Sequence, residues 1–185
     1  MNSGEFAEIY EKEYREAFEK AGITLVSPKF ANSNVDLPAL PAEAYRLVTD
    51  KTAYGIMDIG GDDRGAYALG RYVPAILEED NYRMAFVANC YRPLTRTPEE
   101  AMEVMREIEA ACGLKFTDIV NNSNLGSETT AETVLNSVPF AEKLSSLSGL
   151  PVFATTAVAD VAAELRTMDE VKIEDAFYRN LAFGT

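Results

Sequence analysis

Apolar and polar residues follow two periods along this chain, and the two periods predict strands and helices in turn. Four apolar runs of strand length are each followed by a segment with helical spacing. The runs are AYGIMD, MAFVANC, FTDIVNN and PVFATT. The helices predicted after them cover 64–79, Pro98 to Cys112, Ala131 to Ser148, and Val158 to Leu165. A strand followed by a helix, repeated in this way, predicts right-handed βαβ crossovers and a parallel sheet.

The N-terminal part carries a different pattern. Residues 5–21 place apolar side chains at helical spacing, and Gly22 follows as a C-cap, so we expect an amphipathic helix there. The apolar run ITLVSP predicts a strand, and KFANSNVDLPALP is a loop because of its Asn, Ser and Pro content. Ala42 to Thr49 is expected to form a short helix.

These elements predict one domain of the α/β class with a doubly wound, mostly parallel sheet of about five strands. Within residues 1–185 we expect the amphipathic helix at 1–21, a core at 22–165, and a tail at 166–185. The tail is predicted to form a terminal helix that covers an edge or a face of the sheet.

Charge restricts the partners of the chain. Hydrophobic residues make up 47% and charged residues 25%, which is typical of a globular protein. Seventeen basic and thirty acidic residues give a net charge of −13, which repels nucleic-acid phosphates and anionic lipids. The chain opens without a basic or apolar leader, and no stretch approaches the ~18 apolar residues of a membrane span. We therefore expect a cytoplasmic protein that binds neither nucleic acid nor membranes directly.

The residue types that are missing exclude several chemistries. The sequence contains no histidine, and Cys90 and Cys112 have no CxxC spacing. Catalytic triads that depend on His, HExxH zinc sites and Cys–His dyads are therefore excluded. Both cysteines are expected to be core or near-core residues.

One acidic residue stands where α/β sheets gather their ligands. Asp58 ends the predicted strand YGIMD, and a carboxylate at the carboxyl end of a strand can hold Mg²⁺. The following IGGDDRGA offers glycines whose N–H groups can approach a phosphate. The alternatives are a carboxylate that caps the next turn, and glycines that form a tight turn from strand to helix.

Four segments in order carry a family resemblance. They are YGIMDIGGDDRGAYALGRY, FVANCYRPLTRT, IVNNSNLGSETT and GLPVFATT, and ANSNVDLPALP precedes them. Together they resemble the MinD/ParA-type ATPases of the CobQ/CobB/MinD/ParA nucleotide-binding group, from about Gly22 to about Leu165. The resemblance implies ATP or ADP with Mg²⁺ as ligands, and a P-loop NTPase-like fold.

The resemblance also implies roles for individual residues. Asp58 matches the Walker B aspartate that assists Mg²⁺, and Gly60, Gly61 and Asp62 match the switch segment that senses the γ-phosphate. Asn122 matches an asparagine that contacts the adenine edge. An Asn side chain donates and accepts at once, which suits a base.

Other polar residues have two interpretations each. Asn89 is a looser candidate for the same pocket, whereas Asn121, Asn122 and Asn124 can instead form Asx-turns in a polar loop. Arg92 and Arg96 can face an anion or pair with acids such as Glu99 and Glu100. Thr129 or Thr130 is expected to cap the helix that follows, although a free helix N-terminus there can also receive an anion.

The chain departs from the family because the opening strand-loop-helix-strand unit of the relatives, with its Gly-rich loop that ends in GKT or GKS, is missing from this sequence. Its only Lys-Thr pair, Lys51-Thr52, follows Asp50 and cannot form the phosphate nest. We therefore expect an ATPase-like protein that does not hydrolyse nucleotide on its own and acts through protein contacts, as a homo-oligomer or with a partner protein. The alternative is an ATPase whose P-loop comes from another chain or from a missing N-terminal segment. This pattern agrees with a truncated gene, with a fragment of a longer protein, and with a P-loop part that another chain supplies.

Overall fold

The computed structural model of the chain describes residues 15–26, 42–60 and 63–168. The chain divides into two compact units, Met1–Asp80 and Asn81–Thr185. We call them the first and the second unit. The expectation of a single domain stays a prediction.

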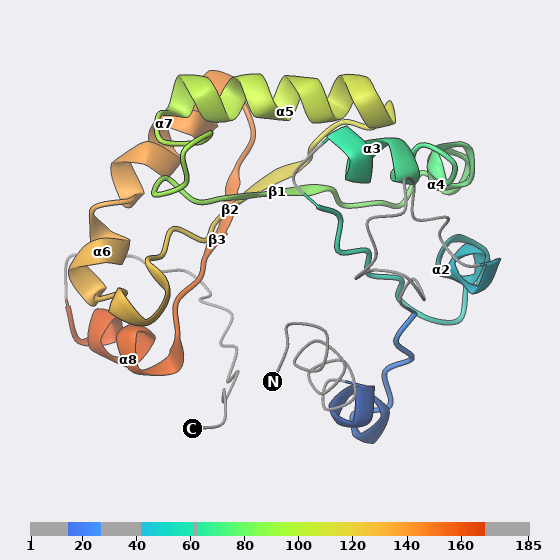
Figure 1. Cartoon of the computed structure of the whole chain (residues 1–185), viewed down its shortest axis with the longest axis horizontal. Coiled ribbons are helices and arrows are strands. Elements are labelled where there is room, and N and C mark those ends of the chain that lie inside the picture. The colour runs from blue at the N-terminus through green and yellow to red at the C-terminus, as the bar shows by residue number, and fades with distance from the viewer. Residues whose placement is uncertain (1–14, 27–41, 61–62, 169–185) are drawn as a thin grey trace, which may run out of the picture. The chain divides into compact units, whose positions relative to one another are not determined.

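The second unit contains a small parallel sheet (Figure 1). Its strands are β1 (Ala85–Ala88), β2 (Asp118–Asn121) and β3 (Val152–Thr155), in the order β1-β2-β3. Ala85 pairs with Asp118 and Ala88 pairs with Asn121, and the register between β2 and β3 shifts by a bulge near Ile119 and Val120. Three predicted strands are therefore confirmed, and the fold is of mixed helix and strand with a parallel sheet.

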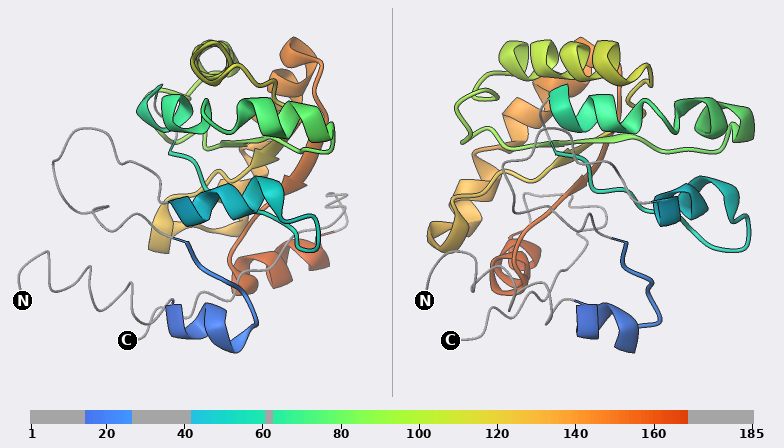
Figure 2. Two further views of the ribbon diagram at one scale, coloured as in Figure 1. Left: turned by 90° about the vertical axis from the view of Figure 1, so that its right-hand side faces the viewer. Right: turned by 45° about the vertical axis from the view of Figure 1, so that its right-hand side comes forward.

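Helices follow each strand of the sheet. They are α5 (Pro98–Cys112), η2 (Gly126–Glu128), α6 (Ala131–Leu135), α7 (Val138–Ser148) and α8 (Ala159–Thr167). α5 links β1 to β2 and α7 links β2 to β3, and the two helices pack against each other on the same face (Figures 1 and 2). Parallel neighbours require such crossovers, since a tight turn cannot join them.

Local signals set the ends of α5. Thr97 accepts a hydrogen bond from the Glu100 N–H, and the Glu100 carboxylate accepts one from the Thr97 N–H, which forms a capping box. Pro98 occupies the first turn, where its missing N–H costs nothing. Gly113 closes the helix with φ +82°, a conformation that costs glycine little. The predicted bounds, Pro98 to Cys112, are confirmed.

Prolines divide two segments that the sequence predicts as single helices. The segment Ala131 to Ser148 forms α6 and α7, and the segment 64–79 forms α3 (Asp63–Leu69) and α4 (Val73–Glu79). In each case proline occupies the first turn of the second helix. A proline ring clashes with the carbonyl four residues earlier and removes one hydrogen bond, so the first helix ends before it. The predictions of two continuous helices are therefore wrong at these prolines.

Two groups of side chains form the core of the second unit. Beneath α5 and α7, apolar side chains from the helices and the sheet are buried, and the central Ile119 is 0% exposed. A separate cluster joins α6 to α8 through Ala131, Val134, Val161 and Leu165. The sheet and its helices thus hold the carboxyl ends of the three strands in fixed positions.

The described residues of the first unit contain short helices and segments without regular structure. Residues 15–20 form the end of a helix, and the remainder of the predicted helix at 5–14 lies outside the described residues. Gly22 has φ +72°, its N–H donates to the Glu19 carbonyl, and the Ile23 N–H donates to the Phe18 carbonyl. These bonds form a Schellman cap, which confirms the predicted C-cap at Gly22. The expected short helix consists of η1 (Ala42–Tyr45) and α2 (Arg46–Thr49).

Two segments predicted as strands do not form strands in the described part of the first unit. Residues 53–58, AYGIMD, have no strand hydrogen bonding, and neither do the described residues 23–26 of ITLVSP. Tyr54 and Ile56 are 101% and 86% exposed. A strand exists only through bonds to a neighbouring strand, and the described part of this unit supplies none. The sheet therefore has three strands among the described residues, compared with about five expected.

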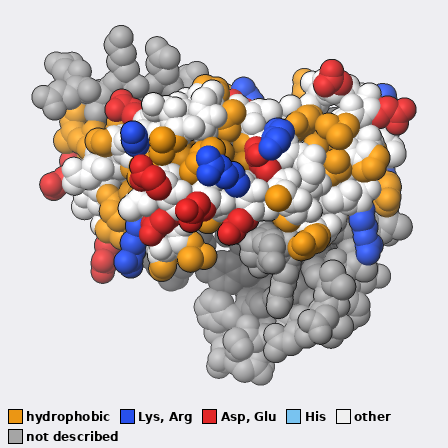
Figure 3. All heavy atoms as spheres, turned by 90° about the horizontal axis from the view of Figure 1, so that it is seen from above, with side chains coloured by type: hydrophobic (Ala, Val, Ile, Leu, Met, Phe, Trp, Pro, Cys, Tyr) orange, Lys and Arg blue, Asp and Glu red, His pale blue; other side chains and the backbone are white. Residues whose placement is uncertain are grey.

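Among the described residues, no helix is long and apolar enough to cross a membrane. On the face drawn in Figure 3, acidic and basic side chains of the described residues are interspersed with hydrophobic ones. The predicted tail helix at 169–185 and the loop at 27–41 lie outside the described residues.

Candidate functional site

The loops after β1, β2 and β3 meet at the carboxyl edge of the sheet. The Asn122 N–H donates to the Ala88 carbonyl at 2.8 Å, and the Thr156 N–H donates to the Asn121 carbonyl at 2.9 Å. These bonds continue the strand ladders by one residue and bring Asn89, Asn122, Asn124 and Thr156 together. We call these four residues the carboxyl-end cluster. Open α/β sheets bind ligands at this edge, so it is the candidate site.

Asn89 joins the loop after β1 to the loop after β2. Its Oδ1 accepts from the N–H of Tyr91 at 2.9 Å and from the N–H of Asn124 at 3.4 Å. Its Nδ2 donates to the Asn124 carbonyl at 3.1 Å. Because an amide oxygen has two lone pairs, these bonds occupy its accepting capacity. The geometry favours a structural role for Asn89, and its place in a ligand pocket stays a prediction.

Asn121 and Asn124 form the Asx-turns that the sequence allows as an alternative. The Oδ1 of Asn121 accepts from the Ser123 N–H, and its Nδ2 donates to the Ser137 Oγ at 2.8 Å. The Oδ1 of Asn124 accepts from the Gly126 N–H, and its Nδ2 donates to the Asn122 carbonyl. Both side chains therefore stabilise the backbone of the loop after β2.

Asn122 differs from its neighbours. It is half-buried, and its Oδ1 accepts from the Thr156 hydroxyl at 2.6 Å. Among the described residues, nothing accepts a hydrogen bond from its Nδ2, and no buried side-chain nitrogen or oxygen lacks a partner. The Nδ2 is therefore open to solvent. Thr156 fixes the amide, whose second lone pair and free N–H groups form a donor and an acceptor side by side.

The loop after β1 is held rigidly beside this cluster. The Thr95 hydroxyl donates to the Asn89 carbonyl at 2.7 Å, and the Tyr91 hydroxyl donates to the Thr133 carbonyl at 2.7 Å. Burial raises the pKa of Tyr91, with further contributions from Cys90. Arg92 and Arg96 are exposed on this loop.

The arginines on this loop have two sequence-based interpretations. Among the described residues neither Arg92 nor Arg96 forms an ion pair with Glu99 or Glu100. The carboxylate of Glu100 belongs instead to the capping box of α5. Pairing with these acids is not observed, and the anion-binding interpretation stays a prediction. Thr130, the N-cap of α6, confirms the capping interpretation of its segment.

The predicted metal and switch residues belong to the first unit. Asp58 is exposed, and among the described residues no three His, Cys, Asp or Glu side chains gather into a metal site. A Cβ on Gly65 would lie 2.8 Å from the Gly60 carbonyl, so the backbone at these two glycines approaches closely. This contact agrees with the tight-turn interpretation of Gly60. Gly61 and Asp62 lie outside the described residues.

One member of the carboxyl-end cluster was not predicted from the sequence, and the cysteines lie where they were expected. Thr156 ends the apolar run of β3 just as Asn122 ends that of β2, and this shared position is a signal that could have identified it. Cys112 is buried and Cys90 is half-buried, and both are free thiols. Their expected core and near-core positions are confirmed.

The chain was compared with known proteins at three levels. No protein-family model, curated protein or solved structure matches it. The resemblance to MinD/ParA-type ATPases therefore stays a prediction.

Proposed function

We propose that this chain is an ATPase-like protein that recognises the base of an adenine nucleotide, does not hydrolyse it alone, and acts through protein contacts. The second unit supplies the base site at its carboxyl-end cluster. The fold proposed is the doubly wound, P-loop NTPase-like sheet of about five strands, of which the described residues contain three parallel strands.

The side chain of Asn122 carries this proposal. The Thr156 hydroxyl fixes its Oδ1, and its Nδ2 is open to solvent among the described residues. Adenine presents a donor beside an acceptor, which an asparagine amide complements with two parallel hydrogen bonds. Guanine presents two acceptors at the corresponding edge, so the same amide discriminates against it.

The printed sequence supports the lack of independent hydrolysis. It contains no Gly-rich loop with GKT or GKS, and Lys51-Thr52 lacks the preceding glycine. Phosphoryl transfer depends on that loop and its lysine for positioning and charge neutralisation. We therefore expect no ATPase activity above background in the isolated chain.

Exposed apolar side chains support the protein contacts. Tyr54 and Ile56 are almost fully exposed on a segment of strand length. A segment of this kind can gain both hydrogen bonds and apolar burial by pairing with a strand of another molecule. A homo-oligomer or a partner protein is therefore proposed, and light scattering at tens of micromolar tests the first of these.

A second candidate function is an ATPase whose P-loop comes from another chain. The exposed carboxylate of Asp58 favours it, because a Walker B aspartate must reach Mg²⁺ beside that loop. If turnover appears and survives repurification, Asp58→Asn should abolish it. Turnover that is unaffected by this substitution would remove Asp58 from the site.

The test of the base site uses NMR titration with AMP, ATP and GMP. We expect weak binding that shifts the amides around Asn122, depends little on the number of phosphates, and favours adenine by roughly 1–3 kcal/mol. Asn122→Asp replaces the donor with an oxygen and should abolish this preference. Asn81→Asp makes the same change at an exposed residue and serves as the control. Equal shifts with GMP and AMP, or none around Asn122, would refute the base site.

A further inference from the structure

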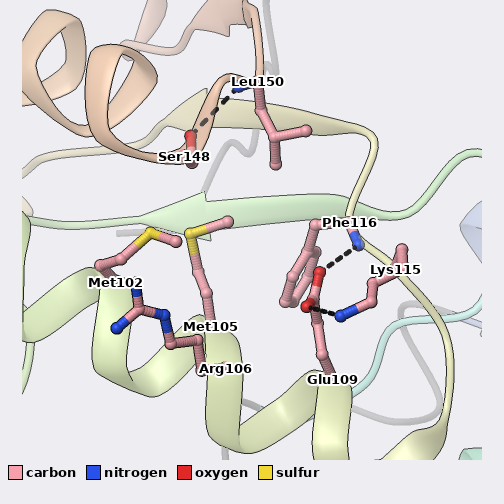
Figure 4. A pocket seen from close by; sticks show the side chains of 8 residues that line it. All are labelled: Met102, Met105, Arg106, Glu109, Lys115, Phe116, Ser148 and Leu150. Atoms are coloured by element: carbon pink, nitrogen blue, oxygen red, sulfur yellow. Dashed lines mark hydrogen bonds and ion pairs between the residues drawn. The ribbon is translucent and has the colours of Figure 1, made fainter.

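A small cavity lies away from the carboxyl-end cluster, between α5 and the segments at 115–116 and 148–150 (Figure 4). Its volume is about 280 Å³. The apolar part of its lining consists of Met102, Met105, Phe116 and Leu150. Met105 and Phe116 are buried, so the apolar surface continues into the core. Methionine side chains adapt to the shape of an apolar ligand, which makes this lining suitable for binding.

Three charged residues also line the cavity, and two of them neutralise each other. The Glu109 carboxylate accepts hydrogen bonds from the Lys115 ammonium and from the Phe116 N–H, the latter at 3.0 Å. Figure 4 shows both bonds at one end of the cavity. Because Glu109 is satisfied in this way, it does not attract a cationic ligand.

Arg106 is the remaining charge in the lining. It is exposed, and among the described residues no carboxylate lies within salt-bridge distance of it. Figure 4 shows its guanidinium group beside Met102, on the far side of the cavity from the Glu109–Lys115 pair. The cavity therefore combines an apolar floor with an unpaired cation at its rim. The net charge of −13 repels anions overall, so the guanidinium of Arg106 is the group in this lining that can bind one.

We propose that this cavity binds a short apolar carboxylate. The hydrocarbon part would lie on Met102, Met105, Phe116 and Leu150, and the carboxylate would form charge-assisted hydrogen bonds with Arg106. At about 30 Å³ for each water molecule, the volume holds roughly nine atoms of that size. A ligand of the size of hexanoate fits, whereas a folded partner or a nucleotide does not. This site is independent of the proposed base site.

Methyl NMR of the methionines in the full chain tests the proposal, with three probes. Hexanoate carries both chemical features, acetate carries only the charge, and hexan-1-ol carries only the apolar chain. We expect hexanoate to shift the methyl signals of Met102 and Met105 saturably, and to leave that of Met57 unchanged. Acetate and hexan-1-ol should bind about tenfold more weakly or not at all, because each lacks one of the two contributions.

Two variants test whether the charge of Arg106 contributes to hexanoate binding. Arg106→Gln should weaken hexanoate binding about tenfold and leave hexan-1-ol unaffected, since it removes the charged hydrogen bonds alone. Arg71→Gln changes an exposed arginine elsewhere and should alter the affinity by less than about twofold. The proposal is overturned if Met102 and Met105 do not respond to hexanoate, if hexan-1-ol binds equally well, or if both variants bind hexanoate as the unmodified chain does.

Discussion

β2 in the second unit and residues 53–58 in the first unit are two apolar segments of similar length with different structures. β2 lies between two parallel strands, and its Ile119 is fully buried. Residues 53–58 form no strand, and the side chains of Tyr54 and Ile56 face solvent. Both segments end in a polar residue, Asn121 in one and Asp58 in the other.

The difference teaches that an apolar run becomes a strand only where neighbours satisfy its backbone. On β2 the Ile119 N–H donates to the Pro151 carbonyl, and the Asn122 N–H at its end donates to the Ala88 carbonyl on the other side. The described part of the first unit offers no such partner to residues 53–58. Backbone hydrogen bonding, and not apolar character alone, separates the two segments.

Hydrogen exchange should give the largest contrast between these segments. The amides of Ile119 and Asn122 are expected to exchange only through extensive unfolding, which costs several kcal/mol and protects them about a thousandfold or more. At concentrations where the chain is monomeric, the amides of 54–58 are expected to exchange near the rate of an unfolded chain. Mass spectrometry or NMR of the amides measures both. Strong protection at 54–58 that grows with protein concentration would mean that another copy supplies the missing strand.

Truncation of one isoleucine in each segment should give the next largest effect. Ile119→Ala leaves a cavity in the core and should lower the free energy of unfolding by about 2–5 kcal/mol. Ile56→Ala removes an exposed side chain and should change it by less than about 0.5 kcal/mol. Urea unfolding of the two variants measures the difference. A loss at Ile56 as large as that at Ile119 would show that Ile56 is buried in solution.

Removal of a helix cap should have a smaller effect and should again distinguish the units. Thr97→Ala breaks the capping box of α5 and should lower the free energy of unfolding by about 1 kcal/mol. Thr49→Ala removes an exposed hydroxyl in α2. This hydroxyl donates to the Tyr45 carbonyl and caps no N–H. We therefore expect the free energy of unfolding to fall by only a few tenths of a kcal/mol. Thermal unfolding followed by circular dichroism compares them. Equal losses would contradict the assignment of the cap to Thr97.

High pH should give the smallest effect, and one tyrosine in each unit is expected to respond in the same direction. Burial, the largest cause in both, raises the pKa of Tyr72 and that of Tyr91. The folded state therefore holds these protons more tightly than the unfolded chain. The resulting stability is complete below the ordinary tyrosine pKa of about 10 and declines as pH rises through the raised values. Tyr72→Phe and Tyr91→Phe should each reduce this decline. If both variants lose stability at high pH as much as the unmodified chain does, groups other than these tyrosines cause the loss.

Much of the second unit follows from local sequence signals. The capping box at Thr97 and Glu100 together with Gly113 set both ends of α5, and three apolar runs gave the positions of β1, β2 and β3. The predictions of continuous helices were wrong only at the prolines that divide them. In the candidate site, Asn122 was predicted through the family resemblance, whereas Thr156 was not predicted.

The sequence by itself determined which segments are apolar, where helices start and stop, and that no phosphate-binding loop with GKT or GKS is present. These properties depend on neighbours within a few residues. Only the tertiary structure decided that residues 53–58 form no strand among the described residues, that Asn89 is occupied by backbone groups, and that Arg106 stands unpaired beside an apolar cavity. The physical reason is that strand pairing, hydrogen-bond saturation and cavities depend on groups that lie far apart in the chain.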